Sequence, residues 1–541
     1  MQRRRIGTGA WLGALISLPV MGLLYLGNQL AGLPFVPFDL FDWLARVLPG
    51  NVVTAGIDTI VGAITFFGLG ATDSTAKLME QLLALGLHLL IGLLLGVLIA
   101  WPAGAQAQRA LTLGGTVGLL LFALIAALEL TTGLGGQPLV VLLWLAILYG
   151  GWGVVVGSLL ERLVQPAAPA PPRRAAPPAG RRTALVQIAG GAAGVALAAW
   201  GVGRFFGRQT VQSGAGQPLA ALATPTAPTV ATSAATAEAT PTPGEPFAPA
   251  PGTRSELTDN ADFYRIDINL TPPVVDRAEW VLETAGLFDN PRSLTLADLM
   301  ALPAVTQPIT LSCISNRIGG DLISTSNWTG VRLRDLLEEL GLQPAATELY
   351  IEATDGFYES VTMEDMLDPR TLLVYGMNGE TLPTEHGFPL RIYIPNRYGM
   401  KQPKWITRME AISEEGAGYW VERGWSETAR PHIISIIDTV AQDAVTAAGA
   451  IPIGGIAWAG DRGIQRVEVQ VDDTDWAEAR LNKPPLSPLT WVQWRYDWPA
   501  ADGEHTFRVR AVDGTGTLQI GEKTGVRPDG ATGYHTVTRS I

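Results

Sequence analysis

The chain contains very little cysteine, with Cys313 alone among 541 residues. A single thiol cannot form an intramolecular disulfide, and it cannot build a zinc or iron–sulfur site, because those sites need several soft ligands. Histidine is also scarce: there are five, and only His88 lies in an apolar run. Since a transmembrane b-type haem usually needs two axial histidines, we expect the apolar segments to act as an anchor rather than as a haem-based electron carrier.

Charged residues are also scarce and make up only 16% of the chain. The formal net charge is −12. A bilayer span takes about 20 apolar residues, so most of the long apolar runs before residue 208 are predicted to be membrane helices. Their density excludes a cleaved secretion signal as the whole explanation. Region 1–204 is therefore predicted to be an all-α transmembrane region. The apolar runs are 10–31, 53–71, 82–101, 110–130, 138–160 and 184–203.

Arginines predict the orientation of these helices, because positively charged loops stay in the cytoplasm. They precede the first run and fill the loop before the last one, so an even number of crossings should separate these two segments. Five apolar runs lie there, and the run containing Asp58 is the weakest, since a carboxylate is costly in lipid. We expect residues 34–72 to be interfacial or re-entrant, which leaves five crossings and places everything after residue 204 outside the cytoplasm. The arginines are Arg3, Arg4, Arg5, Arg162, Arg173, Arg174, Arg181 and Arg182.

The last apolar run opens with Arg181-Arg182 and continues as an alanine-rich stretch. This arrangement is similar to a twin-arginine signal, which suits a protein that folds around a cofactor before export. The alternative is that both arginines only enforce the positive-inside rule. After this run, residues 205–255 are rich in alanine, threonine and proline, and we predict a semi-extended linker.

Residues 256–541 are predicted to be globular and to form two domains. The stretch 331–341 has helical periodicity with a glycine stop, and strand-like runs cover Glu348–Ala353, Leu372–Tyr375 and Leu390–Pro395. Helices and strands in irregular order predict an α+β domain over 256–431.

From residue 432 the chain changes to short alternating strands divided by turns such as Asp502-Gly503. About 110 residues of this pattern predict an immunoglobulin-like β-sandwich over 432–541. Trp491, Trp494 and Trp498 lie on these strands and are interpreted as exposed. Aromatic residues are favoured at interfaces, which suggests a homodimer; the alternative is that these tryptophans fill the core of the sandwich.

Four motifs of the soluble half carry a resemblance to a known family. In chain order they are Phe263-Tyr-Arg-Ile-Asp267 with Trp280 downstream, Cys313-Ile-Ser-Asn-Arg317 with Trp328-Thr-Gly-Val-Arg-Leu downstream, the segment from Tyr375 to Arg391, and the segment from Gly399 to Trp405. Through them, residues 260–425 resemble the molybdopterin-binding domain of the sulfite oxidase family. Residues 432–541 resemble the C-terminal dimerisation domain of that family.

The resemblance implies a molybdenum–molybdopterin cofactor, whose metal is held by one pterin dithiolene and one protein thiolate. Cys313 matches that metal ligand, and the catalytic residues implied are Cys313, Arg265 and Arg317. A phosphate-bearing cofactor also needs fixed donors, and arginine supplies a planar fork for phosphate oxygens. The cofactor contacts implied are Phe263, Tyr264, Asp267, Asn316, Asp355, His386, Arg391, Gln402, Pro403 and Lys404.

One position departs from the family pattern. Family members that oxidise sulfite usually have a second arginine after Arg317, whereas this chain has Ile318. The resemblance therefore implies a membrane-anchored oxidoreductase that performs two-electron oxo-transfer on a sulfoxide-like or other small oxo substrate. An external electron donor or acceptor, quinone-linked or cytochrome-type, would complete the reaction, and no nucleic-acid partner is expected. The alternatives are a sulfite dehydrogenase and a cofactor-free, membrane-tethered binding or assembly module.

Overall fold

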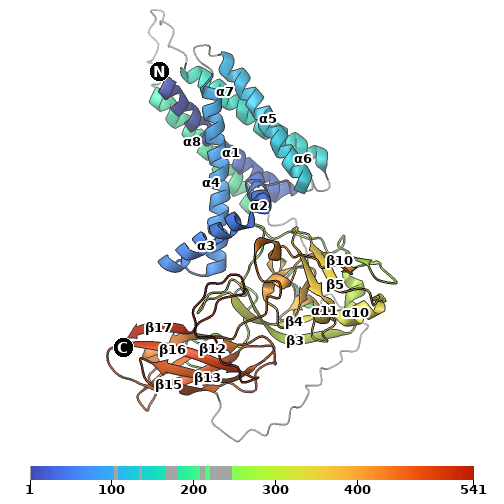
Figure 1. Ribbon diagram of the computed structural model, residues 1–541. Helices are drawn as coiled ribbons and strands as arrows, with labels where there is room; N and C mark the ends of the chain where they lie inside the picture. The colour runs from blue at the N-terminus through green and yellow to red at the C-terminus, as the bar shows by residue number, and fades with distance from the viewer. Residues whose placement is uncertain (1, 103–107, 133–136, 165–180, 207–213, 220–246) are drawn as a thin grey trace, which may run out of the picture. The chain divides into compact units, whose positions relative to one another are not determined.

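A computed structural model describes the chain except for residue 1 and residues 103–107, 133–136, 165–180, 207–213 and 220–246 (Figure 1). Arg173, Arg174 and most of the predicted linker lie outside the described residues. The chain divides into two compact units. The helical unit comprises Met1–Leu48 and Ala76–Gln212, and the β-rich unit comprises Pro49–Thr75 and Ser213–Ile541.

The helical unit consists of long helices that pack through glycine. A Cβ added at Gly13 would lie 2.1 Å from the carbonyl oxygen of Gly92, and one added at Gly114 would lie 2.3 Å from that of Gly153. Small residues of this kind let helix backbones approach closely in membranes. The helices are α1 (Gln2–Ala31), α2 (Val36–Val47), α4 (Thr72–Ala100), α5 (Gln108–Thr132), α6 (Pro138–Leu145), the π-helical turn η1 (Ala146–Gly150), α7 (Gly151–Val164) and α8 (Arg181–Phe206).

Six helices of the described chain are long and apolar enough to cross a membrane, with α6, η1 and α7 counted as one continuous helix. His88 of α4 is buried in this unit, beside a cavity of about 20 Å³ that Ser17, Tyr149 and Trp152 also line. A cavity of that size has room for about one water molecule. His88 is therefore a packed core residue in this structure.

Helix α3 (Gly50–Phe67) is the second of these six helices in chain order, and its contacts place it in the β-rich unit. Its Asp58 forms an ion pair with Arg527, and the same guanidinium donates to the carbonyl oxygen of Thr54 at 3.3 Å. The carboxylate that made this run the weakest predicted span thus has a cationic partner. Phe66 and Phe67, at the other end of the helix, are largely exposed.

The first part of the β-rich unit contains two five-stranded sheets. One has the order β2-β1-β10-β5-β6; the other has the order β3-β4-β7-β8, with β9 paired to β7. Three short helices, α9 (Leu296–Met300), α10 (Leu333–Glu339) and α11 (Met363–Met366), accompany the sheets. The strands are β1 (Leu282–Gly286), β2 (Ser293–Leu294), β3 (Ala304–Ser312), β4 (Ile323–Arg332), β5 (Glu348–Ala353), β6 (Tyr358–Thr362), β7 (Leu372–Met377), β8 (Glu380–Thr381), β9 (Arg391–Tyr393) and β10 (Ile406–Ile412).

The strand predicted at Glu348–Ala353 is confirmed as β5, whereas the helix predicted over 331–341 is shorter. Arg332 remains in β4 and pairs with Leu372 of β7, so α10 begins only at Leu333. Cross-strand pairing here overrides the helical periodicity of the sequence.

The last part of the unit is a single seven-stranded path, β11-β12-β15-β14-β13-β16-β17 (Figure 1). Trp491, Trp494 and Trp498 are 3%, 0% and 8% exposed, so the interpretation of these residues as exposed was wrong. Trp494 packs in a core with Val467 and Phe507, because its strand turns this side chain inward. The strands are β11 (Ile434–Val440), β12 (Ala450–Trp458), β13 (Ile464–Val471), β14 (Ala477–Leu481), β15 (Val492–Pro499), β16 (Glu504–Asp513) and β17 (His535–Ser540).

The described ends of the predicted linker pack on the β-rich unit. The backbone N–H of Gln217 donates to the hydroxyl of Thr381 at 2.9 Å, and Leu219 packs against the core. Arg254, near the other end, forms an ion pair with Asp438 at 2.7 Å.

Candidate active site

The single cysteine lies where β3 ends and the chain turns into β4. Strands β3 and β4 pair up to Ser312 and Ile323, and Cys313 begins the loop that joins them. The N–H of Cys313 donates to the carbonyl oxygen of Leu322 at 3.0 Å, and the side-chain oxygen of Asn316 accepts from the N–H of Leu322 at 3.1 Å. Asn316 thereby holds the loop closed. A Cβ at Gly320 would lie 2.4 Å from the Asn316 oxygen, which explains a glycine there.

The thiol of Cys313 is 7% exposed, and its Sγ lies 3.0 Å from the hydroxyl of Ser315. Burial raises the pKa of the Cys313 thiol, while the hydrogen bond with Ser315 opposes this shift. Burial and the nearby thiol also raise the pKa of Tyr264. A thiolate at this position therefore needs a cationic partner, such as a metal ion.

The first motif runs beside this loop. The N–H of Tyr264 donates to the hydroxyl of Ser324 on β4 at 3.2 Å. Phe263 stacks on Tyr264 with ring centroids 5.5 Å apart. It also packs edge-to-face with the His386 ring, with centroids 5.3 Å apart. The structure thus brings three predicted site residues into one aromatic cluster.

Three cationic side chains from separate segments gather next to this cluster. Arg391 lies over the Trp328 ring at 4.8 Å and donates to the carbonyl oxygen of His386 at 3.1 Å. The ammonium of Lys404 lies 3.7 Å from the carboxylate of Asp267, which also binds Arg265 at 2.7 Å. Residues far apart in the sequence therefore share one polar centre.

The pKa values in this centre reflect burial and crowded positive charge. Burial, together with the Lys404 and Arg391 charges, lowers the pKa of His386 to about 3, so the imidazole is neutral. Burial, together with the Arg391 and Arg265 charges, lowers the pKa of Lys404 to about 8, although Asp267 opposes this shift. The pKa of Arg391 falls to about 10 for the same main reason, burial.

The remaining predicted contacts use their polar groups within the protein. Asp355 is buried, accepts from the N–H of Phe357 at 3.0 Å, and is close enough to raise the pKa of Lys404. Gln402 donates to the carbonyl oxygens of Ile394 and Arg397, whereas its side-chain oxygen is buried without a hydrogen-bond partner. The carbonyl oxygen of Pro403 accepts from a strand N–H at 3.2 Å. Arg317 is half-buried on the cysteine loop.

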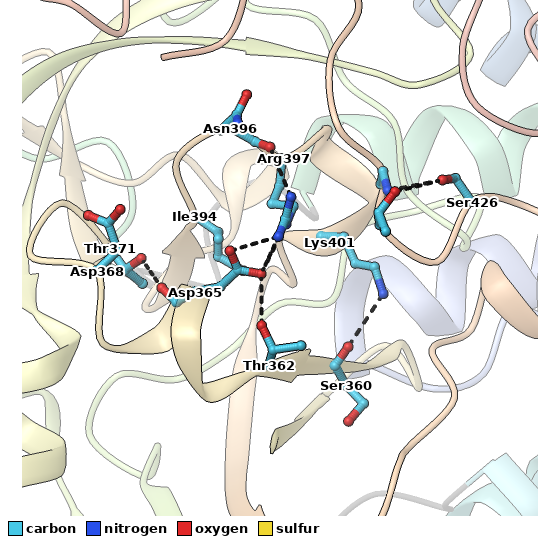
Figure 2. Close-up of polar contacts among 12 residues, drawn as sticks. Ser360, Thr362, Asp365, Asp368, Thr371, Ile394, Asn396, Arg397, Lys401 and Ser426 are labelled. Atoms are coloured by element: carbon cyan, nitrogen blue, oxygen red, sulfur yellow. Dashed lines mark hydrogen bonds and ion pairs between the residues drawn. The ribbon is translucent and has the colours of Figure 1, made fainter. Parts of the chain in front are cut away.

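A network of paired charges positions the loop that carries Gln402, Pro403 and Lys404. Figure 2 shows the guanidinium of Arg397 on the carboxylate of Asp365, at 2.8 Å, and Thr362 donating to the same carboxylate. Lys401 points away from this pair and toward Ser360, whose carbonyl oxygen lies 3.4 Å away (Figure 2). Its ammonium also binds the buried carboxylate of Glu359 at 2.8 Å. These two ion pairs thus fix the segment that leads into Gln402.

Sequence reasoning missed several residues of the site. Asn260 provides the carbonyl oxygen that meets the His386 ring nitrogen at 3.2 Å. Burial raises the pKa of Tyr398 to about 12, and the Cys313 charge contributes, so this ring is near the thiol. Asp73, 192 residues before Arg265, accepts from the Arg265 N–H at 2.8 Å. No local sequence pattern predicts such contacts, because they depend on how distant segments pack.

The donor set suits an anionic, metal-bearing cofactor. Within the described residues, no three His, Cys, Asp or Glu side chains gather in a way that could hold a metal ion. A metal at Cys313 would therefore have fewer than three such protein ligands among the described residues and would need the rest from a cofactor. Around Lys404 the cations Arg265 and Arg391 face the carboxylates of Asp267 and Asp355, which leaves positive charge in excess. The Nη2 atom of Arg265 is also buried without a hydrogen-bond partner.

Comparison with known proteins agrees with this arrangement. Residues 269–420 match the model of the oxidoreductase molybdopterin-binding domain. The chain is 31% identical over 265 residues to a sulfite oxidase of Arabidopsis thaliana, covering 39% of this chain and 67% of that protein. It is 29% identical to the mitochondrial sulfite oxidase of Homo sapiens, covering 48% of this chain and 57% of that one.

A third relative is named for a different reaction. Over 152 residues the chain is 32% identical to a putative protein-methionine-sulfoxide reductase subunit of Azospira oryzae, covering 28% of this chain and 56% of that protein. The chain spans little more than half the length of the human and Azospira relatives. Together with the buried thiol and its cationic surroundings, the matched domain and the relatives show that this chain is a molybdenum-dependent oxidoreductase of the sulfite oxidase family.

Proposed function

We propose that the protein is a membrane-anchored, molybdopterin-dependent enzyme that transfers an oxygen atom with two electrons on a small sulfoxide-like substrate outside the cytoplasm. The observation that carries the proposal is the lone buried thiol beside a surplus of cationic side chains. A bound molybdenum–molybdopterin group would supply the two-electron redox chemistry. Cys313 would hold the metal, and Arg391 and Lys404 would hold the anionic end of the cofactor.

The protein residues would orient the group and exclude water. Asn316 keeps the cysteine loop closed, and Gln402 fixes the opposite loop through two carbonyl oxygens. His386, neutral because of its lowered pKa, can donate or accept a hydrogen bond without adding charge. Arg265 offers a buried N–H that has no partner in the protein.

Ile318 supports a neutral substrate. An aliphatic side chain beside Arg317 cannot form the charge-assisted hydrogen bonds that an anion requires. For a sulfoxide, two electrons and two protons would yield the sulfide and one water molecule, with the electrons supplied by a quinol or a reduced cytochrome. The printed name of the Azospira relative supports this direction.

Sulfite dehydrogenase is the second candidate, supported by the names of the Arabidopsis and human relatives. In that reaction sulfite and water yield sulfate, two protons and two electrons. Steady-state kinetics with sulfite and with a panel of small sulfoxides, each with an artificial electron mediator, separate the two. A charged hydrogen bond contributes about 1.5–3 kcal/mol, so we expect sulfite to bind about one to two powers of ten more weakly than in an enzyme with the second arginine. A sulfite kcat/KM well above that of every sulfoxide would contradict the preferred reaction.

Elemental analysis of the purified full chain tests the cofactor itself. We expect about one molybdenum per chain. A folded chain purified from a molybdate-replete host without molybdenum would support the cofactor-free binding or assembly module instead.

The membrane arrangement belongs to the same proposal. Five crossings, with residues 34–72 at the interface, would place the catalytic residues outside the cytoplasm. Residues 432–541 would form the immunoglobulin-like, dimerisation-type domain of a homodimer. Sedimentation of detergent-solubilised full chain tests the dimer, and a monomer at high concentration would contradict it.

Export through a twin-arginine signal at Arg181-Arg182 is testable with a substitution that keeps the charge. Replacing both residues by lysine should block delivery of the β-rich unit to the outside, as measured by protease accessibility in intact cells. Delivery at the wild-type level would show that the two arginines only set helix orientation.

A further inference from the structure

The junction between α3 and α4 contacts two segments of the candidate site. The carboxylate of Asp73 accepts from the backbone N–H of Arg265 at 2.8 Å. The N–H of Thr72, the preceding residue, donates to the carboxylate of Asp321 at 2.9 Å. Arg265 belongs to the first motif, and Asp321 follows Gly319-Gly320 at the end of the cysteine loop. Two consecutive residues thus connect the segment that carries Arg265 with the loop that carries Cys313.

The junction is itself held in place. Gly68 and Gly70 have φ values of +60° and +102°, a region that glycine adopts without strain, so the chain can turn between the two helices. The hydroxyl of Thr75 donates to the carbonyl oxygen of Leu69 at 3.2 Å, and the second carboxylate oxygen of Asp73 accepts from the N–H of Ser74 at 2.6 Å. These bonds fix the Asp73 side chain in the orientation that meets Arg265.

The far end of α3 is attached to the β-rich unit at a second place. Arg527 binds Asp58 and the carbonyl oxygen of Thr54, and its guanidinium lies 5.6 Å from the centre of the Trp425 ring. Gly50 packs so closely that an added Cβ would lie 3.1 Å from Arg423. Residues 49–75 are therefore anchored at both ends.

The contact at Asp73 acts on the main chain of Arg265, not on its guanidinium. The Nε atom of Arg265 is already held by Asp267 at 2.7 Å, whereas Nη2 is buried without a partner. A side chain fixed at one nitrogen still moves with its backbone. The hydrogen bond that the Arg265 backbone N–H donates to Asp73 therefore acts together with Asp267 to fix where the free side-chain N–H of Arg265 points.

We propose that Asp73 and Thr72 are positioning residues of the active site, and that the apolar segment 49–75 forms one of its walls. The kinetic part rests on the proposed function; the structural part does not. Asp73 would fix Arg265 for the substrate, and Thr72 would fix the cysteine loop through Asp321. The regions that the sequence predicts to be membrane anchor and catalytic domain would then share one functional element.

Hydrogen exchange on the detergent-solubilised full chain tests the structural part. Asp73→Ala removes the acceptor, so the peptide that contains Arg265 should exchange at least ~10-fold faster, the loss expected for a hydrogen bond to a charged group. Asp73→Asn keeps an acceptor oxygen and should restore most of the protection. Ser74→Ala, a matched neighbour, should exchange like the wild type. Unchanged exchange in Asp73→Ala would overturn the proposal.

Thr72 can be tested through its N–H alone. Thr72→Pro removes the donor to Asp321, yet proline is tolerated at the first position of a helix, and α4 begins at Thr72. Thr72→Ala keeps the donor and serves as the control. The peptide that contains residues 319–322 should exchange faster in Thr72→Pro only. Equal exchange in both variants would remove Thr72 from the proposal.

Kinetics then distinguish positioning from a general loss of stability. We expect Asp73→Ala to lower kcat/KM by about 10-fold with molybdenum content unchanged, and Asp73→Asn to recover most of it. A parallel loss of molybdenum and activity in both variants would contradict positioning of Arg265. If the wild-type chain lacks molybdenum and turnover, the proposed function fails, while the exchange measurements still decide whether residues 49–75 form the wall.

Discussion

Two groups of buried cations lie within a few residues of each other and differ in how their charge is balanced. Arg397 and Lys401 each have one carboxylate, Asp365 at 2.8 Å and Glu359 at 2.8 Å. Lys404, three residues later, shares Asp267 with Arg265 and has Arg391 close by. The paired group stabilises the loop, whereas the surplus group is left in need of an anion.

The difference separates structural charge from functional charge. Taking a charge out of water is costly, and a well-placed partner offsets that cost. Buried cations that are only partly balanced by carboxylates are common where a ligand supplies the missing charge, because strongly perturbed groups cluster at functional sites. The position of Lys404, 3.7 Å from Asp267 and with Arg391 and Arg265 nearby, therefore points to a bound anion, in keeping with a pKa that burial lowers.

Removing the Cys313 thiol, which lies near the cations around Lys404, should have the most severe consequence. We expect Cys313→Ser to lower activity by more than ~100-fold, because even the outer partners of metal ligands contribute about 10–100-fold. Molybdenum content should fall with it. The thermal unfolding midpoint should change little, since serine occupies nearly the same volume. Full activity in this variant would show that Cys313 is not the metal ligand.

Lys401→Met tests the paired group. Removing one partner leaves the Glu359 carboxylate buried without compensation, which costs about 3–5 kcal/mol. The unfolding midpoint of the detergent-solubilised chain should drop by roughly 5–15 °C. A variant as stable as the wild type would mean that the ion pair contributes nothing to the loop.

Lys404→Met tests the surplus group, and we expect the opposite result. Here one of three crowded cations is removed, so the chain without cofactor should be at least as stable as the wild type. Cofactor retention should weaken by about 10–100-fold, the loss of one charge-assisted hydrogen bond, measured as molybdenum per chain after dialysis. Loss of stability with retained molybdenum would assign Lys404 to the paired group.

Much of this organisation could be predicted from the sequence, and the missing part has a physical cause. The apolar runs, strand β5 and the gathering of Phe263, His386, Arg391 and Lys404 follow from local patterns and from motif resemblance. The three tryptophans could not be placed, because alternation along a strand does not say which face meets the core. Asp73 could not be found either, since its hydrogen bond to Arg265 joins segments that no periodicity relates.

We expect the weakest effect from pH, which should change the stability that the Glu359–Lys401 pair contributes. Burial raises the pKa of Glu359 from 4.5 to about 7, although the Lys401 ammonium opposes this. The folded state therefore binds a proton more tightly than the unfolded state between these pH values, and stability is lost as pH rises from about 4.5 through about 7.

Glu359→Gln isolates this dependence, because glutamine does not titrate in this range. We expect the unfolding midpoint of the wild type, relative to that of Glu359→Gln, to fall between pH 4.5 and 7 by an amount equivalent to roughly 1–3 kcal/mol. One oxygen of Glu359 is buried without a hydrogen-bond partner, so ionisation has an uncompensated cost even beside Lys401. A relative midpoint that rises over the same range would mean that Lys401 fully stabilises the Glu359 carboxylate. By contrast, Asp267 does not fully balance the cations around Lys404.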